Sequence, residues 1–347
     1  MTGFATRLIR WQHQHGRSTL PWQGADAYRV WLSEIMLQQT QVATVIPYYR
    51  RFVARFADVA ALAQASEDEV LAHWSGLGYY SRARNLHAAA QLIMQQHAGQ
   101  FPRRFEQILA LPGIGRSTAA AICALAYHER HAILDGNVKR VLARHAAIEG
   151  YPGDKKIEAR LWQQAEALLP QVDVAAYTQG LMDLGALICT RSKPQCSICP
   201  LQADCQAYQQ GRVTELPTPR PRKALPEKHS TFLLLRNGSD ILLEKLASSG
   251  IWGGLWCPPQ FVDVQAALAW CALSGVEIIA EKKLPPFTHS FTHFKLHIIP
   301  LSVEVRRKPL IAAQPGNVWL EMEEALHAAI PTPVRKIISE LRKGDAS

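Results

Sequence analysis

Four of the seven cysteines in this chain of 347 residues lie close together, and their spacing is typical of a metal centre. Cys189, Cys196, Cys199 and Cys205 follow the pattern C-x6-C-x2-C-x5-C, with Pro200 directly after the third cysteine. Structural zinc sites usually have two short cysteine pairs or include histidines. A single CxxC pair between longer gaps suits four thiolates around an iron–sulfur cubane better. The spacing therefore favours a [4Fe–4S] cluster, with zinc as the alternative.

The remaining cysteines, Cys123, Cys257 and Cys271, are scattered and odd in number, as expected of small core residues. Cysteines that cluster as the other four do indicate a metal site in a reducing compartment, not a disulfide framework. The N-terminus has no apolar run of signal-peptide length, and no later segment is apolar enough to span a bilayer. The sequence therefore predicts a cytoplasmic protein with no membrane partner.

Two carboxyl groups stand in contexts that would separate their pKa values. Asp135, in ILDGNVKRVLAR, precedes Gly136 and a helix-forming run, so it is expected to cap that helix, whose first amides favour the ionised carboxylate. Glu34, in WLSEIMLQQTQ, shares one helical stripe with Gln38 and Gln41. The stripe is either a solvated face or the lining of a cleft. In a cleft, apolar neighbours would raise the pKa of Glu34 and make it a proton donor, and such a pair of carboxyl groups can cleave a glycosidic bond.

The stretch LPGIGRSTAAA, from Leu111 to Ala121, ends one helix and starts another within a few residues. Gly113 and Gly115 permit backbone conformations that other residues avoid, and Ser117 lies in the first turn of the new helix. Free amides at a helix start, together with the positive end of the helix dipole, suit a phosphate group. An ordinary corner between two helices is the other interpretation.

The hydrophobic period divides the chain into two domains. A period of three to four predicts an all-α domain at residues 1–208. Residues 209–228 contain four prolines and five basic residues, which suits an extended linker. A period of two then predicts a smaller α+β domain at residues 229–347. The helices are expected at residues 4–11, 28–37, 81–94, 117–128, 138–148, 177–189 and 334–343, and the strands at residues 230–237, 240–246, 289–305 and 317–322.

Several motifs in one order give the chain a specific resemblance. WLSEIMLQQTQVATVIP, GLGYYSRARNL, LPGIGRSTA, ILDGNVKRVLAR, MDLGALIC and the cysteine spacing resemble the MutY family of adenine DNA glycosylases, and GIWGGLWCPPQF and FTHSFTHFKLHI extend the resemblance beyond the linker. The net charge of +9 agrees with a nucleic-acid partner. The resemblance implies a helix–hairpin–helix DNA glycosylase domain with a [4Fe–4S] cluster loop and a Nudix-like C-terminal domain. It also implies a monomer that removes adenine opposite 8-oxoguanine or guanine from double-stranded DNA.

The resemblance implies a role for each candidate residue of the helical domain. The hairpin amides, from Leu111 to Gly115, would grip one DNA phosphate. After the adenine has flipped out of the duplex, Glu34 would protonate it, and Asp135 would stabilise the cationic sugar. Asn137 would lie near the sugar and the catalytic water.

Ser117 stands where endonuclease III, a sibling with a similar hairpin and cluster, has a catalytic lysine that forms a Schiff base. A serine there implies a glycosylase without a dedicated strand-cutting lysine. Lys139 lies four residues after Asp135 and could react adventitiously with an abasic site. Ser117 and Lys139 are both implied to contact DNA. Gln39 and Tyr79 would be wedge residues that fill or brace the gap left by the flipped adenine.

The two arginines that follow Tyr79 are expected to have no such role. Tyr80 is interpreted as a core residue, and Arg82 and Arg84 as surface charges. The implied wedge in this motif is therefore Tyr79 alone.

The C-terminal domain resembles a Nudix fold but lacks the catalytic motif of Nudix hydrolases. No REUxEExGU helix occurs in residues 229–347, so the magnesium-binding glutamates of a pyrophosphatase are missing. The MutY family reads 8-oxoguanine through a Phe-Ser-His loop, and the corresponding residues here are Phe291, Thr292 and His293. Threonine keeps the hydroxyl group of serine and adds a methyl group, so lesion recognition is still expected.

Two other functions fit parts of the sequence. A bifunctional glycosylase and lyase of the endonuclease III type would act on oxidised pyrimidines, but Ser117 and the extra C-terminal domain argue against it. A non-catalytic iron–sulfur protein that binds DNA would need the hairpin and the cysteines but neither Glu34 nor Asp135. The three functions differ in what they do to an adenine mispair, which an excision assay can measure.

Overall fold

The computed structural model describes residues 3–221, 224–307 and 316–345, which form two compact units. The first unit holds residues 3–64 and 85–221. The second unit holds the rest of the described chain, and it includes residues 65–84 from the N-terminal half of the sequence. None of the helices in the described residues is both long and apolar enough to cross a membrane.

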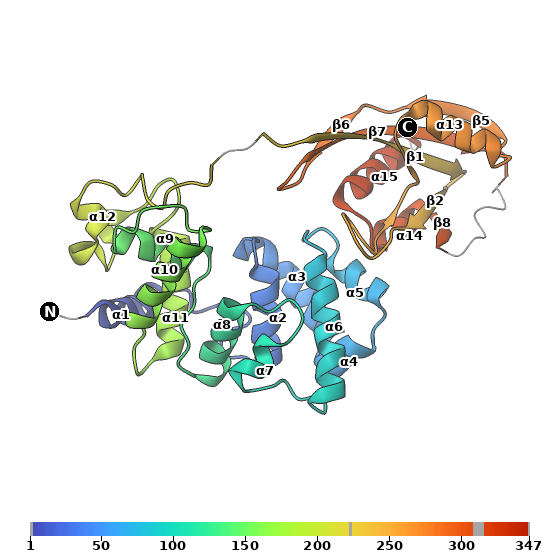
Figure 1. Cartoon of the computed structure of the whole chain (residues 1–347). Coiled ribbons are helices and arrows are strands. Elements are labelled where there is room, and N and C mark those ends of the chain that lie inside the picture. The colour runs from blue at the N-terminus through green and yellow to red at the C-terminus, as the bar shows by residue number, and fades with distance from the viewer. Residues whose placement is uncertain (1–2, 222–223, 308–315, 346–347) are drawn as a thin grey trace. The chain divides into compact units, whose positions relative to one another are not determined.

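The first unit is helical, as its sequence period predicts (Figure 1). Aspartates in extended conformation cap several of its helices: Asp26 accepts a hydrogen bond from the Arg29 amide, and Asp154 accepts one from the Lys156 amide. The helices are α1 (Phe4–His15), α2 (Ala27–Leu37), α3 (Val42–Arg55), α4 (Val59–Gln64), α6 (Ser81–Gln96, which begins within the second unit), α7 (Phe105–Leu109), α8 (Arg116–Tyr127), α9 (Gly136–His145), α10 (Lys155–Ala167), α11 (Val174–Asp183) and α12 (Gln206–Gln209).

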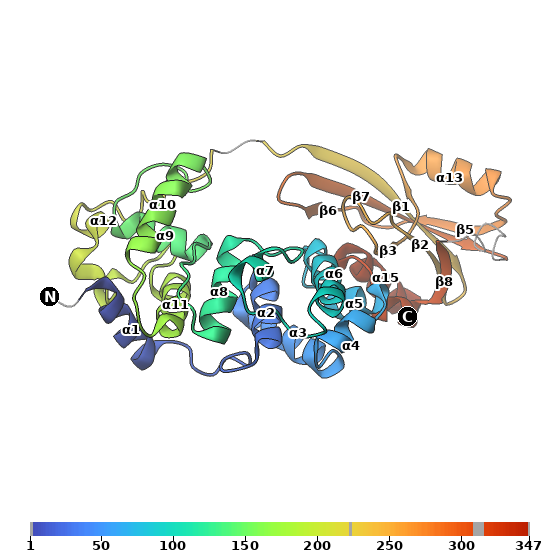
Figure 2. The same cartoon turned by 60° about the horizontal axis from the view of Figure 1, so that its bottom comes forward.

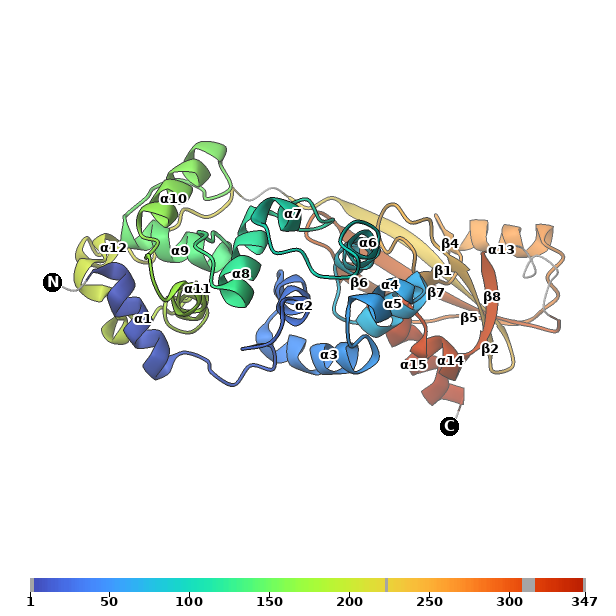
Figure 3. The same ribbon diagram turned by 90° about the horizontal axis from the view of Figure 1, so that it is seen from below.

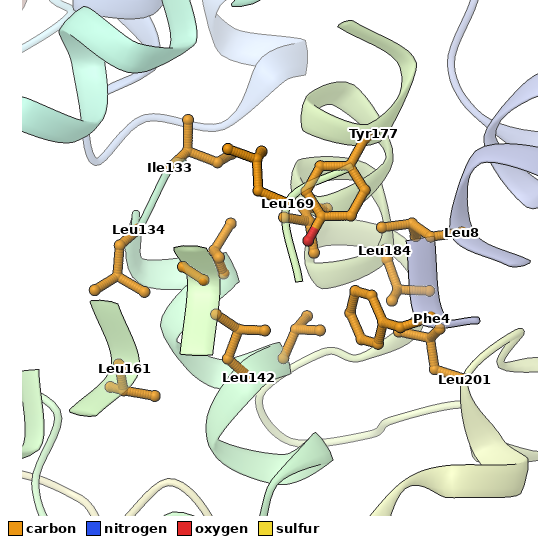
Figure 4. Close-up of a cluster of buried hydrophobic side chains, with 14 of the residues drawn as sticks. Phe4, Leu8, Ile133, Leu134, Leu142, Leu161, Leu169, Tyr177, Leu184 and Leu201 are labelled. Atoms are coloured by element: carbon orange, nitrogen blue, oxygen red, sulfur yellow. The ribbon is translucent and has the colours of Figure 1, made fainter. Parts of the chain in front are cut away.

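One hydrophobic core joins the two ends of this unit (Figure 4). Phe4 and Leu8 of α1 pack in the same cluster as Leu142 of α9 and Tyr177 of α11. Leu134 is buried in this cluster with 4% of its surface exposed. Because Leu134 immediately precedes Asp135, the core fixes the chain at the start of α9.

Helix α8, which follows the LPGIG hairpin, occupies a central place in the helical unit (Figure 3). It packs against α2 and against α11. Small residues at Ala119, Ala120 and Ala124 are buried along α8 and permit close packing with its neighbours. The helix that carries Glu34 is thereby docked on the helix that begins at the hairpin.

The cysteine segment follows α11 as a series of short turns. Helix α11 continues into a π-helical turn, η1 (Leu184–Ile188), which ends at Cys189. Two 3₁₀ turns, η2 (Cys196–Ile198) and η3 (Gln202–Asp204), separate the remaining three cysteines. Such tight turns bring several side chains of one short segment to the same side.

The second unit is built on a mixed sheet with the strand order β3-β2-β1-β7-β5. Strands β1 and β7 pair in parallel, and the other pairs are antiparallel. Helix α13 lies on one face of the sheet and α15 on the other (Figure 2). The elements are α5 (Glu67–Trp74), β1 (Glu227–Asn237), β2 (Asp240–Lys245), β3 (Trp256–Cys257), β4 (Gln260–Phe261), α13 (Val264–Leu273), β5 (Ile278–Lys283), β6 (Phe287–Ser290), β7 (Lys295–Val305), β8 (Asn317–Glu321), α14 (Met322–His327) and α15 (Thr332–Asp345).

The expected strand at residues 289–305 is wrong as a single element. It is divided into β6 and β7, which pair with each other in antiparallel register. The Phe291 amide donates a hydrogen bond to the Phe294 carbonyl at 2.9 Å and closes a tight turn between the two strands. The alternation breaks at the turn, where Thr292 and His293 are both exposed, and Phe291 and Phe294 stack on each other across it with ring centroids 4.5 Å apart. The lesion-reading residues expected from the sequence therefore lie at a hairpin tip.

Candidate active site

Glu34 lies on α2 between residues that withdraw it from water. Trp31, Ile35 and Met36 are buried around it, and Glu34 itself is partly buried. Within the described residues, no hydrogen-bond donor reaches its carboxyl group. Burial, together with the negative charge of Asp135, raises the pKa of Glu34 to about 8. At neutral pH the carboxyl group is therefore protonated and can donate its proton.

Asp135 is the N-cap of α9, as the sequence predicts. Its Oδ1 accepts hydrogen bonds from the amides of Asn137, at 2.7 Å, and Val138, at 2.8 Å. Burial raises the pKa of Asp135, whereas the two amides and the positive charges of Arg140 and Lys139 lower it. The amides thus favour the ionised carboxylate, as the sequence predicts, but burial has the larger effect on the pKa.

The two carboxyl groups nevertheless differ in how strongly their surroundings stabilise the charged form. Asp135 accepts two backbone N–H donors, which stabilise its charged form, and Glu34 has no comparable donor. Each negative charge also opposes the other, as the effect of Asp135 on Glu34 shows. The cap amides therefore favour a negative charge on Asp135 over one on Glu34.

Two adjacent hydroxyl groups in the first turn of α8 connect the segments that carry these carboxyl groups. The Ser117 Oγ accepts a hydrogen bond from the Leu134 amide at 2.9 Å, directly before Asp135. The Thr118 Oγ1 accepts one from the Gln38 side chain at 3.4 Å, one helical turn after Glu34. The side chain of Ser117 thus supports the backbone at Asp135, a role that its position in the sequence did not reveal.

The hairpin before α8 presents free backbone donors. Gly113 and Gly115 are exposed, and neither amide donates a hydrogen bond within the described residues. Gly113 has φ +78°, and a Cβ there would lie 2.7 Å from the Cβ of Asn85, so this position requires glycine. The Leu111 side chain is 2% exposed and belongs to the core, which leaves its backbone as the part that could face a ligand.

The side chains that follow Asp135 are already paired. The Arg140 guanidinium donates to Asn137 Oδ1 at 2.8 Å, so Asn137 is held beside the cap. Lys139 Nζ forms an ion pair with Glu158 Oε1 at 2.6 Å. This ion pair would have to break before Lys139 could reach an abasic site, which disfavours Lys139 as a nucleophile.

The four predicted ligand cysteines line one pocket, and none of them is in a disulfide. Four thiols on a loop of short turns fit a four-iron cluster by the chemistry of the donor set. The guanidinium of Arg144, which is 2% exposed, donates to Cys189 Sγ at 3.3 Å. Arg140 donates to the Cys189 carbonyl at 2.7 Å. Both arginines lie on α9, one and two turns after Asp135, so this helix connects the cysteine loop to the Asp135 carboxylate.

Arg140 and Arg144 were missed as functional residues in the sequence. Both appear in ILDGNVKRVLAR as ordinary positive charges on an amphipathic helix. Their spacing of four places them on one face, but the pattern does not say that this face meets the cysteine loop. That information lies in the tertiary fold.

In the second unit, the remaining predicted residues gather around one pocket of about 500 Å³. Tyr79 lines it from the segment before α6, and Phe291, Thr292 and His293 line it from the tip of the β6–β7 hairpin. Trp252 lies beneath the hairpin tip, with its ring centroid 5.3 Å from that of Phe291. Thr292 and His293 are exposed, so their polar groups are available to a ligand.

Both predicted wedge residues have an unusual backbone conformation. Gln39 has φ +57° and Tyr79 has φ +50°, a region that residues with side chains rarely adopt. Gln39 is exposed, and 43% of the Tyr79 surface is exposed. Strained and exposed side chains of this kind are concentrated at binding sites.

Arg82 and Arg84 are not free surface charges, contrary to expectation. Arg82 is 7% exposed, lies over the rings of Trp74 and Tyr79, and donates to the Gly78 carbonyl at 3.1 Å. Burial lowers its pKa to about 10. Arg84 donates to the Gly253 carbonyl. Both arginines therefore support the segment that carries Tyr79.

Three protein families match separate parts of the chain. Residues 32–167 match the HhH-GPD superfamily of base excision DNA repair proteins, and residues 231–340 match the NUDIX domain. Residues 189–205 match the iron-sulfur binding domain of endonuclease III. These matches confirm the predicted multidomain fold and favour the [4Fe–4S] cluster over zinc.

Individual relatives extend the likeness to the whole chain. The adenine DNA glycosylase of Buchnera aphidicola subsp. Acyrthosiphon pisum is 40% identical over 345 residues, which cover 98% of each chain. The adenine DNA glycosylase of Mus musculus is 33% identical and covers 97% of this chain and 77% of its own. Among solved structures, a thermostable thymine-DNA glycosylase has a TM-score of 0.55 and 28% identity over 60% of this chain and 95% of its own. The likeness to the first two relatives runs through both compact units.

Proposed function

Because the chain belongs to the adenine DNA glycosylase family and carries an iron–sulfur cluster loop, we propose that it removes adenine opposite 8-oxoguanine or guanine in double-stranded DNA. The chain is a base excision repair glycosylase, and DNA is its partner. The identity of the opposing base, the catalytic residues and action as a monomer on chromosomal DNA in the cytoplasm are part of the proposal. The observation that carries it is the arrangement of two carboxyl groups, Asp135 held by two cap amides and Glu34 without a hydrogen-bond donor and with its pKa raised to about 8 by burial and by the charge of Asp135.

Hydrolysis begins with proton transfer from Glu34 to the flipped adenine, at N7. The bond between adenine and the sugar then breaks, its electron pair leaves with the neutral base, and the sugar becomes cationic. Asp135 stabilises this positive charge with its carboxylate. Water adds to the sugar, and the Glu34 carboxylate takes up the proton that the water loses. Acid catalysis of this type contributes about 10²–10⁴-fold, so charge stabilisation by Asp135 has to supply much of the remaining rate.

DNA is held through the backbone of the helical unit. The free amides of Gly113 and Gly115 precede the N-terminus of α8, where the helix dipole also favours an anion. These amides are suited to one backbone phosphate. When bound, the cluster supplies four iron–thiolate bonds that tie the turns between Cys189 and Cys205 together.

Adenine excision without strand cleavage is the expected chemistry. A lyase of the endonuclease III type needs an amine that attacks the sugar, and residue 117 offers a hydroxyl group that already accepts the Leu134 amide. Lys139 is the nearest lysine in the sequence, and its ammonium group is engaged in an ion pair with Glu158. We therefore propose that the chain is a mainly monofunctional glycosylase.

Recognition of the opposing base is proposed for the pocket of the second unit. Phe291 offers an aromatic face, and Thr292 and His293 offer exposed polar groups at the hairpin tip. 8-Oxoguanine differs from guanine by one carbonyl and one N–H group, so a few polar groups suffice to distinguish them. Tyr79, on the opposite wall, would enter the duplex beside the lesion.

A single-turnover assay with defined duplexes tests this proposal. Duplexes with A·8-oxoguanine, A·G, A·T or an oxidised pyrimidine are incubated with excess protein, and half of each sample is treated with alkali. We expect cleavage of the A·8-oxoguanine and A·G duplexes only after alkali. Cleavage of the oxidised pyrimidine without alkali would favour the bifunctional lyase. Tight binding without any excision would favour a non-catalytic DNA-binding protein.

A further inference from the structure

Residues 65–84 pack with the C-terminal part of the chain through a buried polar contact. The Ser75 hydroxyl donates a hydrogen bond to the Ile330 carbonyl at 2.9 Å. The guanidinium of Arg335, on α15, donates to the Ser75 Oγ at 2.9 Å. Ser75 is 7% exposed, and Ile330 is fully buried. This contact therefore joins two segments that are more than 250 residues apart in the sequence.

A tyrosine adds a second connection at the same place. The Tyr80 hydroxyl donates to the Ile330 carbonyl at 3.4 Å and accepts a hydrogen bond from the Gly76 amide at 3.3 Å. Tyr80 is 7% exposed. Ser75 and Tyr80 enclose the loop that carries Tyr79, so both ends of this loop meet the one carbonyl of Ile330.

Three residues of the loop between these two contacts have positive φ angles. Gly76 has φ +100°, Gly78 has φ +77° and Tyr79 has φ +50°. The Gly78 carbonyl accepts hydrogen bonds from Trp74 Nε1 at 3.0 Å and from the Arg82 guanidinium at 3.1 Å. The left-handed conformation costs little at the two glycines, but at Tyr79 it costs conformational energy and persists because surrounding contacts determine it.

Arg335 is placed to transmit the position of α15 to this loop. Its guanidinium donates both to the Leu326 carbonyl, at the end of α14, and to Ser75. The planar fork of arginine can hold two acceptors in a fixed relation, which the single ammonium of lysine cannot do in the same way. The side chain thus joins the α14–α15 corner to the base of the Tyr79 loop.

We propose that Arg335, acting through Ser75 and the Ile330 carbonyl, is a positioning residue that sets Tyr79 against the lesion-reading hairpin tip. This inference rests on the proposed function, because it concerns the pocket that Tyr79 shares with Phe291, Thr292 and His293. Helix α15 lines this pocket through Thr332 and Pro333, whereas Arg335, in the same turn of the helix, is not part of the lining. The preference for 8-oxoguanine over guanine therefore depends on a residue outside the pocket.

The test uses the full-length protein loaded with its cluster. Affinities for duplexes with a non-cleavable adenine analogue opposite 8-oxoguanine or guanine are measured for wild type, Arg335→Ala, Arg335→Lys, Ser75→Ala and Tyr79→Ala. We expect Arg335→Ala to reduce the 8-oxoguanine preference about tenfold, the scale of one hydrogen bond from a charged group. Arg335→Lys should restore part of the preference, and Arg335→Ala should add little to Tyr79→Ala.

Lys245→Ala is the matched control. It removes an ion pair with Asp68, at 2.7 Å, that joins the same two segments at the start of α5. It should leave the preference within twofold of wild type, a margin set for an exposed pair. Thermal unfolding of each variant separates a loss of stability from a loss of positioning.

The proposal is overturned if Arg335→Ala lowers Tm but keeps the wild-type preference. It is also overturned if the fold-reductions in preference caused by Arg335→Ala and by Tyr79→Ala multiply fully in the double variant. If Arg335→Ala does not fold, Ser75→Ala decides the question by the same two criteria. Failure of the proposed function looks different: the wild-type protein would show no preference for either opposing base, or no adenine excision.

Discussion

In the helical unit, Glu34 and Asp135 are withdrawn from water and held by a helix and a helix cap, whereas Thr292 and His293 in the second unit stand exposed on a hairpin tip. The proposed chemistry of the first pair depends on burial, because burial moves the Glu34 pKa into the range where a carboxyl group can act as an acid. The proposed role of Thr292 and His293 depends on their exposure. A side chain that recognises a base has to exchange its bound water for the edge of that base.

The carboxyl groups and the hairpin tip are also held in place in different ways. The carboxyl groups are placed by elements that belong to the core, through Leu134 and the first turn of α8. The hairpin tip is placed by aromatic stacking of Phe291 on Phe294 and by Trp252 beneath it. Changes in the first region should therefore affect rate, and changes in the second should affect the choice of opposing base.

The largest effect is expected from removal of the acid. Glu34→Gln keeps the shape of the side chain but has no proton to donate. Adenine excision should fall by about 10²–10⁴-fold or more, the usual contribution of a general acid. Affinity for the mispaired duplex should stay close to that of wild type. Single-turnover rates and binding curves measure both, with Glu106→Gln as the control because that carboxylate is exposed.

If Glu34→Gln excises adenine at nearly the wild-type rate, the acid is wrongly identified. If it loses binding as well as excision, Glu34 acts in the fold rather than in proton transfer. Either result would contradict the view that the helical unit determines the excision rate whereas the hairpin tip determines the choice of opposing base.

The cluster loop should give the next largest effect. Cys199→Ser removes one thiolate from a set of four, and the turns between Cys189 and Cys205 lose a common anchor. We expect poor folding or weak DNA binding, while wild-type protein is brown and absorbs near 400 nm. Cys123→Ala, at a buried cysteine outside the loop, is the control. Metal analysis that finds stoichiometric zinc and neither iron nor sulfide would contradict the cluster.

A smaller effect is expected at the hydroxyl that supports Asp135. Ser117→Ala leaves the Leu134 amide without its acceptor, which costs about 1–3 kcal/mol for a buried donor. We expect a lower Tm, from the lost stability, and slower excision, because the backbone next to Asp135 loses a support that holds its position. Ser117→Thr keeps the hydroxyl group and should restore both. Equal rates for the alanine and threonine variants would show that the hydrogen bond does not position Asp135.

The smallest effect is expected at the hairpin tip. Thr292→Val removes one hydroxyl group and keeps the shape of the side chain. One hydrogen bond contributes about 0.5–1.5 kcal/mol, so the preference for 8-oxoguanine over guanine should fall about three- to tenfold. Additional replacement of Phe291 by alanine should weaken it further. The ratio of affinities for the two opposing bases measures this effect, and an unchanged ratio in the double variant would mean that the hairpin tip does not read the lesion.

Local patterns made much of the helical unit predictable. The N-cap at Asp135, the glycine at Gly113 and the cysteine spacing each depend on residues that are close in the sequence. Such features depend on backbone conformation and short-range contacts, and a single sequence carries that information.

Features that depend on tertiary packing were not predictable. Arg82 is buried although its motif suggests a surface charge, and the pKa of Asp135 is raised although its cap suggests the opposite. Residues 65–84 pack with the C-terminal part, which no hydrophobic period indicates. A protein cut near residue 225 would therefore expose Ser75 and Tyr80, and its helical part cannot be assumed to behave as in the full chain.

The pH dependence of single-turnover adenine excision tests the central claim most directly. Glu34 acts only when protonated, and its pKa is raised to about 8, so the rate should stay high at neutral pH and fall as the pH rises through about 8. Above that pH it should fall about tenfold for each unit, as expected when one protonated acid is lost. The residual rate of Glu34→Gln should lack this limb. A wild-type rate that stays constant from neutral pH to pH 10, or the same limb in Glu34→Gln, would contradict proton donation by Glu34.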